Sequence, residues 1–373
     1  MLEKGKISPR QAGELMFITL LATVILLVPE ITADLAGHDA WLATFVGSLF
    51  GLLTVGIIAW LGLKHPGKTI YQYAESVLGK YPGKLVGLAY VWIFLHLAAM
   101  VVRQFGDFLT TSFMVLTPLS VFNISLTALA ALAVIMGLEV ITRMSEFIIL
   151  LVVSFLLLVI TLSIGNWELN QLLPFMKDGI MPVLRGAIVP AAFHGEIVVL
   201  AVLIPFLTRP KAAFLSGTAA VTASALLLTM AVVGTLAVFG PELTTSFRFP
   251  IHLFVRSINI GKVLTRFEVV VMVTWVAGVF IKISVLYYCA ALGTAQVFGL
   301  SEYRSTVLPL GVLITALSVL LFEDIAELVS FLAQAWPRFS ISVYFFGLPF
   351  LLLLVTVIRE KIFGHSFGGQ QDE

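Results

Sequence analysis

Apolar runs of about 20 residues recur along the whole chain, and they constrain its fold more than any other feature. A helix of that length crosses the roughly 30 Å of hydrocarbon in a bilayer. Apolar residues make up 60% of the 373 positions and charged residues only 12%, about half their share in soluble domains. We therefore predict an all-α polytopic membrane protein with ten spans, at about 10–36, 40–63, 84–112, 119–137, 142–164, 183–207, 212–240, 267–298, 305–322 and 339–358.

The distribution of Lys and Arg predicts the orientation of these spans. An even number of spans puts both termini on one side of the membrane. Thirteen of the 22 Lys and Arg residues then lie on the side of the termini and eight on the other, with Lys282 inside a span. Because cytoplasmic loops are enriched in Lys and Arg, we expect both termini in the cytoplasm.

No linker of domain size interrupts the chain. We predict one transmembrane domain over residues 1–363 and a short disordered cytoplasmic tail over 364–373, which is rich in Gly and Gln. Residues 64–83 are expected to contain a short interfacial helix. The connection 241–266 carries both aromatic and basic residues, so it forms either an amphipathic hairpin over the outer vestibule or a solvated loop.

Local motifs indicate one helix start and two close helix contacts. Ser8-Pro9-Arg10-Gln11 has the pattern of a capping box with proline at the first helical position, which predicts that the first helix begins here. Gly47-x-x-x-Gly51 and Gly83-x-x-x-Gly87 permit neighbouring helices to approach closely in lipid, although this spacing is common.

Two of the predicted spans carry helix-breaking residues. The sixth contains Pro190 and the stretch Ala192-Phe193-His194-Gly195-Glu196, and the first contains Pro29. Each of these spans opens a group of five, and because five is odd the second group is inverted relative to the first. Broken helices at matching positions of inverted repeats, here about 8–164 and 180–358, indicate a binding site between the repeats near the bilayer midplane.

Ionisable residues inside spans are the candidate functional side chains, because an unpartnered charge in lipid costs several kcal/mol. In a functional role, Glu196 holds a ligand ammonium or carries a proton. In a structural role, it accepts hydrogen bonds from broken backbone or pairs with Lys282. Lys282 either anchors the helix bundle as a buried cation or snorkels to an interface. His194 and His96 either contact ligand or are satisfied by packing and by neighbouring carbonyls.

The same residues exclude several classes of function. A net charge of +1 does not favour nucleic acid as a partner. No second His or Cys lies at metal-ligand spacing from His194, so we expect neither a metal nor another cofactor. The chain has no His-Glu-x-x-His, no paired intramembrane aspartates and no Gly-x-Ser-x-Gly, so we do not expect an enzyme.

Several short motifs, in this order, resemble one known family. They are Ile7-Ser8-Pro9-Arg10-Gln11, Gly195-Glu196-Ile197, Leu203-Ile204-Pro205-Phe206-Leu207, Arg266-Phe267-Glu268, Trp275 and Phe280-Ile281-Lys282-Ile283. The chain resembles the spore-germination permeases, the B subunits of GerA-type germinant receptors, within the amino acid–polyamine–cation transporter superfamily. The resemblance covers roughly residues 7–360.

This resemblance implies a LeuT-like fold with helices 1 and 6 broken, in the inner membrane of a bacterial spore. It implies a germinant-sensing subunit that binds a small amino acid or similar polar ligand and acts with a larger membrane subunit and a lipoprotein subunit. A proton-coupled amino-acid transporter is the alternative, and a channel gated through this fold is a third possibility.

The implied ligand site lies at the two broken helices. Its residues are Ala22, Thr23, Val24, Ile25, Phe193, His194, Gly195, Glu196 and His96, with Glu196 and Lys282 as coupling or structural charges. The first stretch departs from the superfamily, which places glycines where this chain has Ala22 and Val24.

Overall fold

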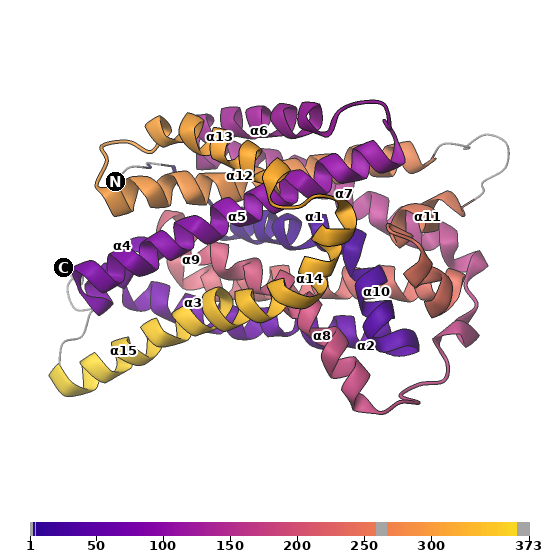
Figure 1. The fold of residues 1–373 in the computed structure, drawn as a ribbon. Coiled ribbons are helices and arrows are strands. Elements are labelled where there is room, and N and C mark those ends of the chain that lie inside the picture. The colour runs from indigo at the N-terminus through magenta and orange to yellow at the C-terminus, as the bar shows by residue number, and fades with distance from the viewer. Residues whose placement is uncertain (1–2, 4, 259–266, 364–373) are drawn as a thin grey trace.

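Long helices packed side by side make up most of the computed structural model, which describes residues 3, 5–258 and 267–363 (Figure 1). The long helices are α1 (Pro9–Ala36), α5 (Lys80–Ser112), α6 (Leu119–Met136), α7 (Leu138–Ser163), α10 (Ala213–Ser246) and α12 (Phe267–Phe298). The other spans are composed of shorter pieces, which are α2 (Ala40–Ser48), α3 (Phe50–Lys64), α8 (Ile180–Gly195), α9 (Leu200–Leu203), α13 (Arg304–Leu320), α14 (Ile325–Ser340) and α15 (Gly347–Phe363). Two short helices lie in connections, α4 (Ile70–Leu78) and α11 (Pro250–Arg256).

The ten predicted spans all fall on helices. In the part of the chain that is described, eight helical stretches are long and apolar enough to cross a membrane. The first of them, Pro9–Lys64, joins the first two predicted spans, and the ninth span is the shorter helix α13. The all-α polytopic architecture is therefore confirmed, whereas the predicted tail 364–373 lies outside the described residues.

The start of α1 and the end of α15 lie at the same end of the bundle (Figure 1). Ile7, just before α1, forms a parallel bridge with Leu207 at the end of the sixth span. Lys64 at the end of α3 forms an ion pair with Glu360 in α15, with 3.0 Å between Nζ and Oε1. The predicted interfacial helix in 64–83 is α4, at this same end.

The first helix is continuous, so the predicted break in the first span is wrong. α1 is helical from Pro9 to Ala36, through Pro29, and its capping box at Ser8 and Gln11 is formed as predicted. Val24 is fully buried among neighbouring side chains. A β-branched side chain tolerates strained backbone poorly, and no glycine is present to accept an unwound conformation. The helix therefore keeps its regular hydrogen bonds at this position.

The sixth span is interrupted where the sequence predicts. α8 ends at Gly195, the chain tightens into a 3₁₀ turn over Glu196–Val199, and α9 follows. Pro190 inside α8 removes one backbone donor, which weakens the regular ladder one turn before the change. The interruption is thus a change of helix type that keeps the backbone hydrogen-bonded, rather than an unwound loop.

Small residues let the helices approach closely, because helix association in lipid depends on packing rather than on hydrophobic burial. A Cβ added to Gly47 of α2 would lie 2.1 Å from the carbonyl oxygen of Ala187 in α8, and one added to Gly83 would lie 2.2 Å from the Cα of Glu75 in α4. Both predicted glycine motifs therefore mark close contacts.

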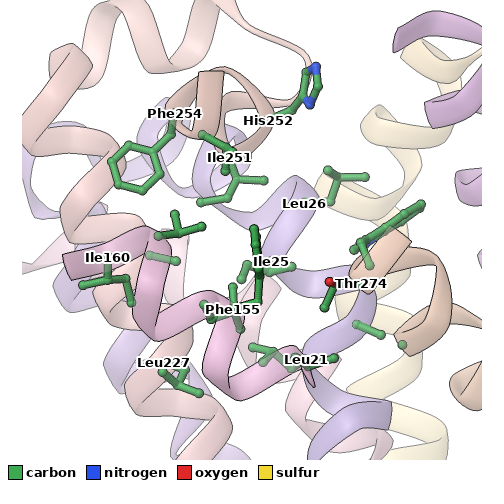
Figure 2. Close-up of a pocket in the computed structure, with 18 of the residues that line it drawn as sticks. Leu21, Ile25, Leu26, Phe155, Ile160, Leu227, Ile251, His252, Phe254 and Thr274 are labelled. Atoms are coloured by element: carbon green, nitrogen blue, oxygen red, sulfur yellow. The ribbon is translucent and has the colours of Figure 1, made fainter. Parts of the chain in front are cut away.

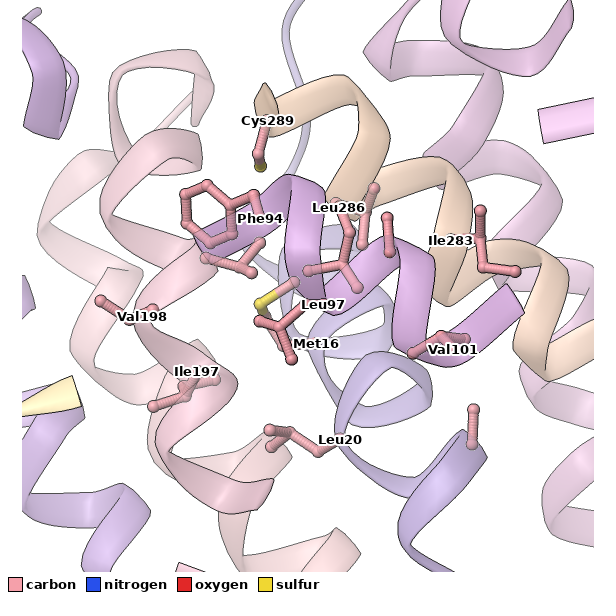
Figure 3. Close-up of a cluster of buried hydrophobic side chains, with 14 of the residues drawn as sticks. Met16, Leu20, Phe94, Leu97, Val101, Ile197, Val198, Ile283, Leu286 and Cys289 are labelled. Carbon is pink, nitrogen blue, oxygen red and sulfur yellow. The ribbon is translucent and has the colours of Figure 1, made fainter. Parts of the chain in front are cut away.

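The central core lies where α1, α5, the sixth span and α12 meet (Figure 3). Figure 3 shows Met16 and Leu20 of α1 facing Phe94 and Leu97 of α5, with further side chains from the other two elements around them. All four side chains are buried. This core holds α1 and the interrupted span next to each other.

Two connections differ from the predicted loops. Residues 323–338, expected outside the membrane, form most of α14, whose N-cap Asp324 accepts a hydrogen bond from the backbone N–H of Glu327. In the connection 241–266, α10 continues past a kink at Gly240 (φ 71°) and the short helix α11 follows. The solvated-loop alternative is therefore wrong for Pro250–Arg256, which are helical and mostly buried. The amphipathic hairpin stays a prediction, and residues 259–266 lie outside the described residues.

Candidate functional site

A buried ion pair lies where α1, the interrupted sixth span and α12 meet. The Nζ of Lys282 is 2.6 Å from Oε2 of Glu196, and both side chains are almost fully buried. The same ammonium donates a hydrogen bond of 2.7 Å to Oγ1 of Thr23. It also lies 5.8 Å from the ring centroid of Phe193. These four side chains, from three helical segments, form what we call the ion-pair cluster.

Pairing explains how two charges persist at this depth. Each ion compensates for the hydration that the other loses, so the pair is tolerated where a single charge would not be. The alternative in which Lys282 snorkels to an interface is wrong, because its side chain has no exposed surface. The structural pairing of Glu196 with Lys282, one of the two interpretations of that glutamate, is observed.

His194 and Gly195 contact residues outside this cluster. The Nδ1 of His194 lies 3.0 Å from the carbonyl oxygen of Pro190, and its Nε2 lies 3.1 Å from Oγ of Ser224 in α10. A Cβ on Gly195 would lie 2.5 Å from the ring of Phe345, and Gly195 has an ordinary helical φ of −63°. Both residues therefore serve packing between helices in this conformation.

His96 belongs to an aromatic group between α5 and α14. Its ring stacks on Trp92 with centroids 5.7 Å apart, and it also lies 5.7 Å from Trp336 and 6.2 Å from Phe331. The packing interpretation of His96 therefore describes this structure. The contacts with Trp336 and Phe331 were not predicted, because α14 was not predicted.

Ala22 and Ile25, also predicted to bind ligand, line a separate cavity (Figure 2). Figure 2 shows Ile25 from α1, Phe155 from α7 and Leu227 from α10 around this space, with Ile251 of α11 above. Its volume is about 70 Å³. Most of the residues that line the cavity were not predicted from the sequence. In an apolar run such as that of α7, the residues that face the cavity do not differ in type from those that face lipid.

The predicted site residues thus fall into three groups. Thr23, Phe193 and Glu196 gather with Lys282, Ala22 and Ile25 line the cavity, and His194, Gly195, His96 and Val24 are packed elsewhere. The first two groups adjoin each other along α1, because Ala22 and Thr23 are consecutive. The two faces of this helix therefore meet different environments.

This architecture has clear relatives among solved transporters. MhsT in complex with L-phenylalanine superposes with a TM-score of 0.65 at 14% identity, over 95% of this chain and 99% of that one. Mhp1, a nucleobase-cation-symport-1 family transporter in a closed conformation with bromovinylhydantoin bound, gives a TM-score of 0.67 at 13% identity, over 92% of this chain and 79% of that one. At these identities the similarity defines the fold, and the protein is a polytopic membrane protein with a LeuT-like transporter fold.

Sequence comparison identifies the family more narrowly. Residues 6–325 match the family model of the spore germination proteins, and the chain belongs to this spore-permease family. It is 29% identical to the spore germination protein YndE of Bacillus subtilis over 96% of this chain and 98% of that protein. It is 26% identical to the spore germination protein KB of the same organism, over 96% and 97% of the two chains. The family and the fold are those of permeases and transporters rather than of enzymes.

Proposed function

We propose that this protein is a germinant-sensing membrane subunit that binds a small amino acid or similar polar ligand at the ion-pair cluster. The observation that carries the proposal is the pairing of Lys282 with Glu196 at 2.6 Å, at the junction of three helical segments. A free amino acid carries one ammonium and one carboxylate. It can enter between the two residues, with its carboxylate on Lys282 and its ammonium on Glu196.

Such an exchange of partners keeps every charge paired. Charge-assisted hydrogen bonds replace the direct ion pair, so no isolated charge is buried. The exchange also requires the three segments to separate, since both side chains are closed off in this conformation. A ligand that stabilises the separated arrangement shifts the population towards it, which is a signal that partner subunits can receive.

Membership of the spore-permease family supports a proposal for the partners and the location. We propose that the protein acts with a larger membrane subunit and a lipoprotein subunit in the inner membrane of a bacterial spore. Its relatives include spore germination proteins A2 and B2 of Bacillus subtilis, which supports a role in germination without naming the ligand. Both termini are proposed to be cytoplasmic.

The alternative is a proton-coupled amino-acid transporter. It is favoured by the transporter fold and by a carboxylate, Glu196, that could exchange its Lys282 partner for a proton during transport. The two functions differ in one measurable respect: a sensor binds its ligand, whereas a coupled carrier also accumulates it.

Purified protein in proteoliposomes tests both. We expect saturable binding of a labelled small amino acid, and no concentrative uptake under an imposed proton gradient. Glu196→Gln should weaken binding roughly tenfold or more, because one charge-assisted hydrogen bond is worth about 1.5–3 kcal/mol. Proton-driven accumulation would establish the transporter instead. If Glu196→Gln left binding unaffected, the ligand would not bind at this cluster.

A further inference from the structure

The cavity beside α1 is chemically unlike the ion-pair cluster. It is lined by side chains of α1, α5, α7, α10, α11 and α12, and the lining includes neither Thr23, Glu196 nor Lys282. Among the described residues that line it there is no Asp, Glu, Lys or Arg, and His252 is the only one of them with an ionisable side chain. A zwitterion placed here would lose its hydration without gaining a counter-charge. The cavity therefore does not fit the amino acid proposed for the cluster.

One polar group in the lining lacks a partner. Trp275 of α12 is 9% exposed, and its Nε1 has no hydrogen-bond acceptor in the described part of the protein. Its ring is held by Phe108, at a centroid distance of 4.6 Å, and by Phe105, at 6.3 Å. Buried indole N–H groups usually have a partner, so the unpaired Nε1 of this lining residue is a donor that a ligand with a hydrogen-bond acceptor could satisfy.

The wall of the cavity includes residues at the membrane-facing surface. Val152, Phe155 and Leu156 of α7 and Thr274 of α12 are only half-buried. These residues belong to helices that the hydropathy places in the bilayer. A molecule dissolved in the membrane therefore meets the cavity wall directly.

We propose that this cavity is a second binding site, for a small uncharged, mainly apolar molecule with one hydrogen-bond acceptor, such as an aromatic aldehyde or a ketone. The molecule enters from the bilayer, packs its apolar part among the side chains of α1, α7 and α10, and accepts a hydrogen bond from Nε1 of Trp275. This site goes beyond the proposed sensing function and does not depend on it.

Occupancy of this site would act on the ion-pair cluster through two helices. Ala22 in the cavity wall precedes Thr23, which bonds Lys282, and Gly278 in the wall lies one helical turn before Lys282. A molecule that fills the space resists movement of α1 against α12. The second site would therefore modulate any motion that separates the cluster.

A matched pair of fluorinated probes tests the site and the donor separately. We would titrate the protein in nanodiscs with 4-fluorobenzaldehyde, which has an acceptor, and with 4-fluorotoluene, which has none, and follow the bound signal by ¹⁹F NMR. Empty nanodiscs correct for partition into lipid. We expect saturable binding of both, with the aldehyde tighter.

Two variants then assign the binding to the cavity. Trp275→Phe keeps an aromatic ring and removes the donor, so the aldehyde should bind roughly fivefold more weakly, as for one lost hydrogen bond, while the toluene is unaffected. Gly278→Leu should abolish binding of both, because a Cβ there meets only ordinary contacts at 3.6 Å and the longer side chain projects into the space. Gly56→Leu on α3, where a Cβ meets nothing within 4 Å, is the matched control.

The outcomes separate cleanly. No saturable signal above empty nanodiscs, or binding that survives Gly278→Leu in correctly folded protein, would overturn the site. Equal affinity of the aldehyde for the wild type and Trp275→Phe would overturn the hydrogen bond from Nε1. An amino acid that competes with the probes at millimolar concentration would contradict the separation of the two sites.

Discussion

Lys282 and Glu196 neutralise each other at a depth where neither side chain reaches water. Removing one partner leaves the other as an uncompensated buried charge. We expect Lys282→Met to lower the free energy of unfolding by about 3–5 kcal/mol, and Lys282→Arg to lower it less. The double variant with Glu196→Gln should recover part of the loss, because no charge is then left alone. Thermal unfolding in detergent measures all three.

A surface pair supplies the control for these variants. Lys64 and Glu360 also form an ion pair, at 3.0 Å, but their side chains are 37% and 22% exposed. Lys64→Met should therefore cost no more than about 1 kcal/mol, the usual range for exposed pairs. A loss as large as that of Lys282→Met would mean that burial does not distinguish the two pairs.

Gly195 is required by packing rather than by backbone conformation. A Cβ at this position would lie 2.5 Å from the ring of Phe345, while the helical φ of Gly195 suits any residue. We expect Gly195→Ala to destabilise the protein and Phe345→Leu to restore part of the stability in the double variant. Gly56→Ala, which meets nothing within 4 Å, is the control. Failure of the second substitution to compensate would point to ligand contact as the reason for the glycine.

His65 gives the protein a pH dependence outside the membrane spans. Burial, and then the charge of Lys68, lowers the pKa of His65 from 6.5 to about 4. The unfolded chain therefore binds more protons than the folded protein between these values, so stability is complete above about pH 6.5 and falls as the pH drops towards 4. We expect His65→Gln to flatten this part of the stability profile. An unchanged slope would assign the acid sensitivity to other groups.

At the scale of helices, hydropathy predicted the spans well because it is a local property. Features that depend on contacts between helices, such as α14, were predicted less well. The sixth span is interrupted at Glu196, where Pro190 and Gly195 are visible in the sequence. α14 was missed because it is short and amphipathic, and its buried face is recognised only against its neighbours α8 and α5. The break in the first span was wrong because it was transferred from a pattern whose glycines this chain lacks.

Continuity of α1 has a direct experimental consequence. Backbone amides of Ala22, Thr23 and Val24 should exchange with solvent as slowly as those of the turns before and after them, because opening them requires the helix to unfold. Hydrogen exchange followed by mass spectrometry measures this. Val24→Gly should raise the exchange rate locally, since glycine lowers helix stability by about 1 kcal/mol. Fast exchange of this stretch in the wild type would support the unwound helix of the transporter pattern.

At the scale of the whole molecule, the sequence predicted the polytopic class and the order of the helices, and it singled out Glu196 and Lys282. It did not predict which side chains would meet. The contact of Thr23 with Lys282 joins residues 259 positions apart, and a hydropathy profile carries no information about such pairs. The inverted repeats over 8–164 and 180–358 stay a prediction based on the number of spans.

Topology across the membrane follows from which ends of the helices lie together. The connection containing Lys68 and the end of α15 containing Lys361 are at one end of the bundle, and Glu242 follows the kink near the other end of α10 (Figure 1). All three residues are exposed. Since the end with the termini carries more Lys and Arg, we expect it to be cytoplasmic.

Single cysteines at these positions test the topology in intact cells. Cys289, the native thiol, is buried and is not expected to react with a membrane-impermeant maleimide. A cysteine replacing Glu242 should therefore be labelled from outside, and cysteines replacing Lys68 or Lys361 only after the membrane is permeabilised. Labelling of Lys68→Cys and Glu242→Cys from the same side would contradict the arrangement of the spans. If Lys68→Cys and Lys361→Cys were labelled from outside, and Glu242→Cys only after permeabilisation, the fold would stand but its orientation in the membrane would be inverted.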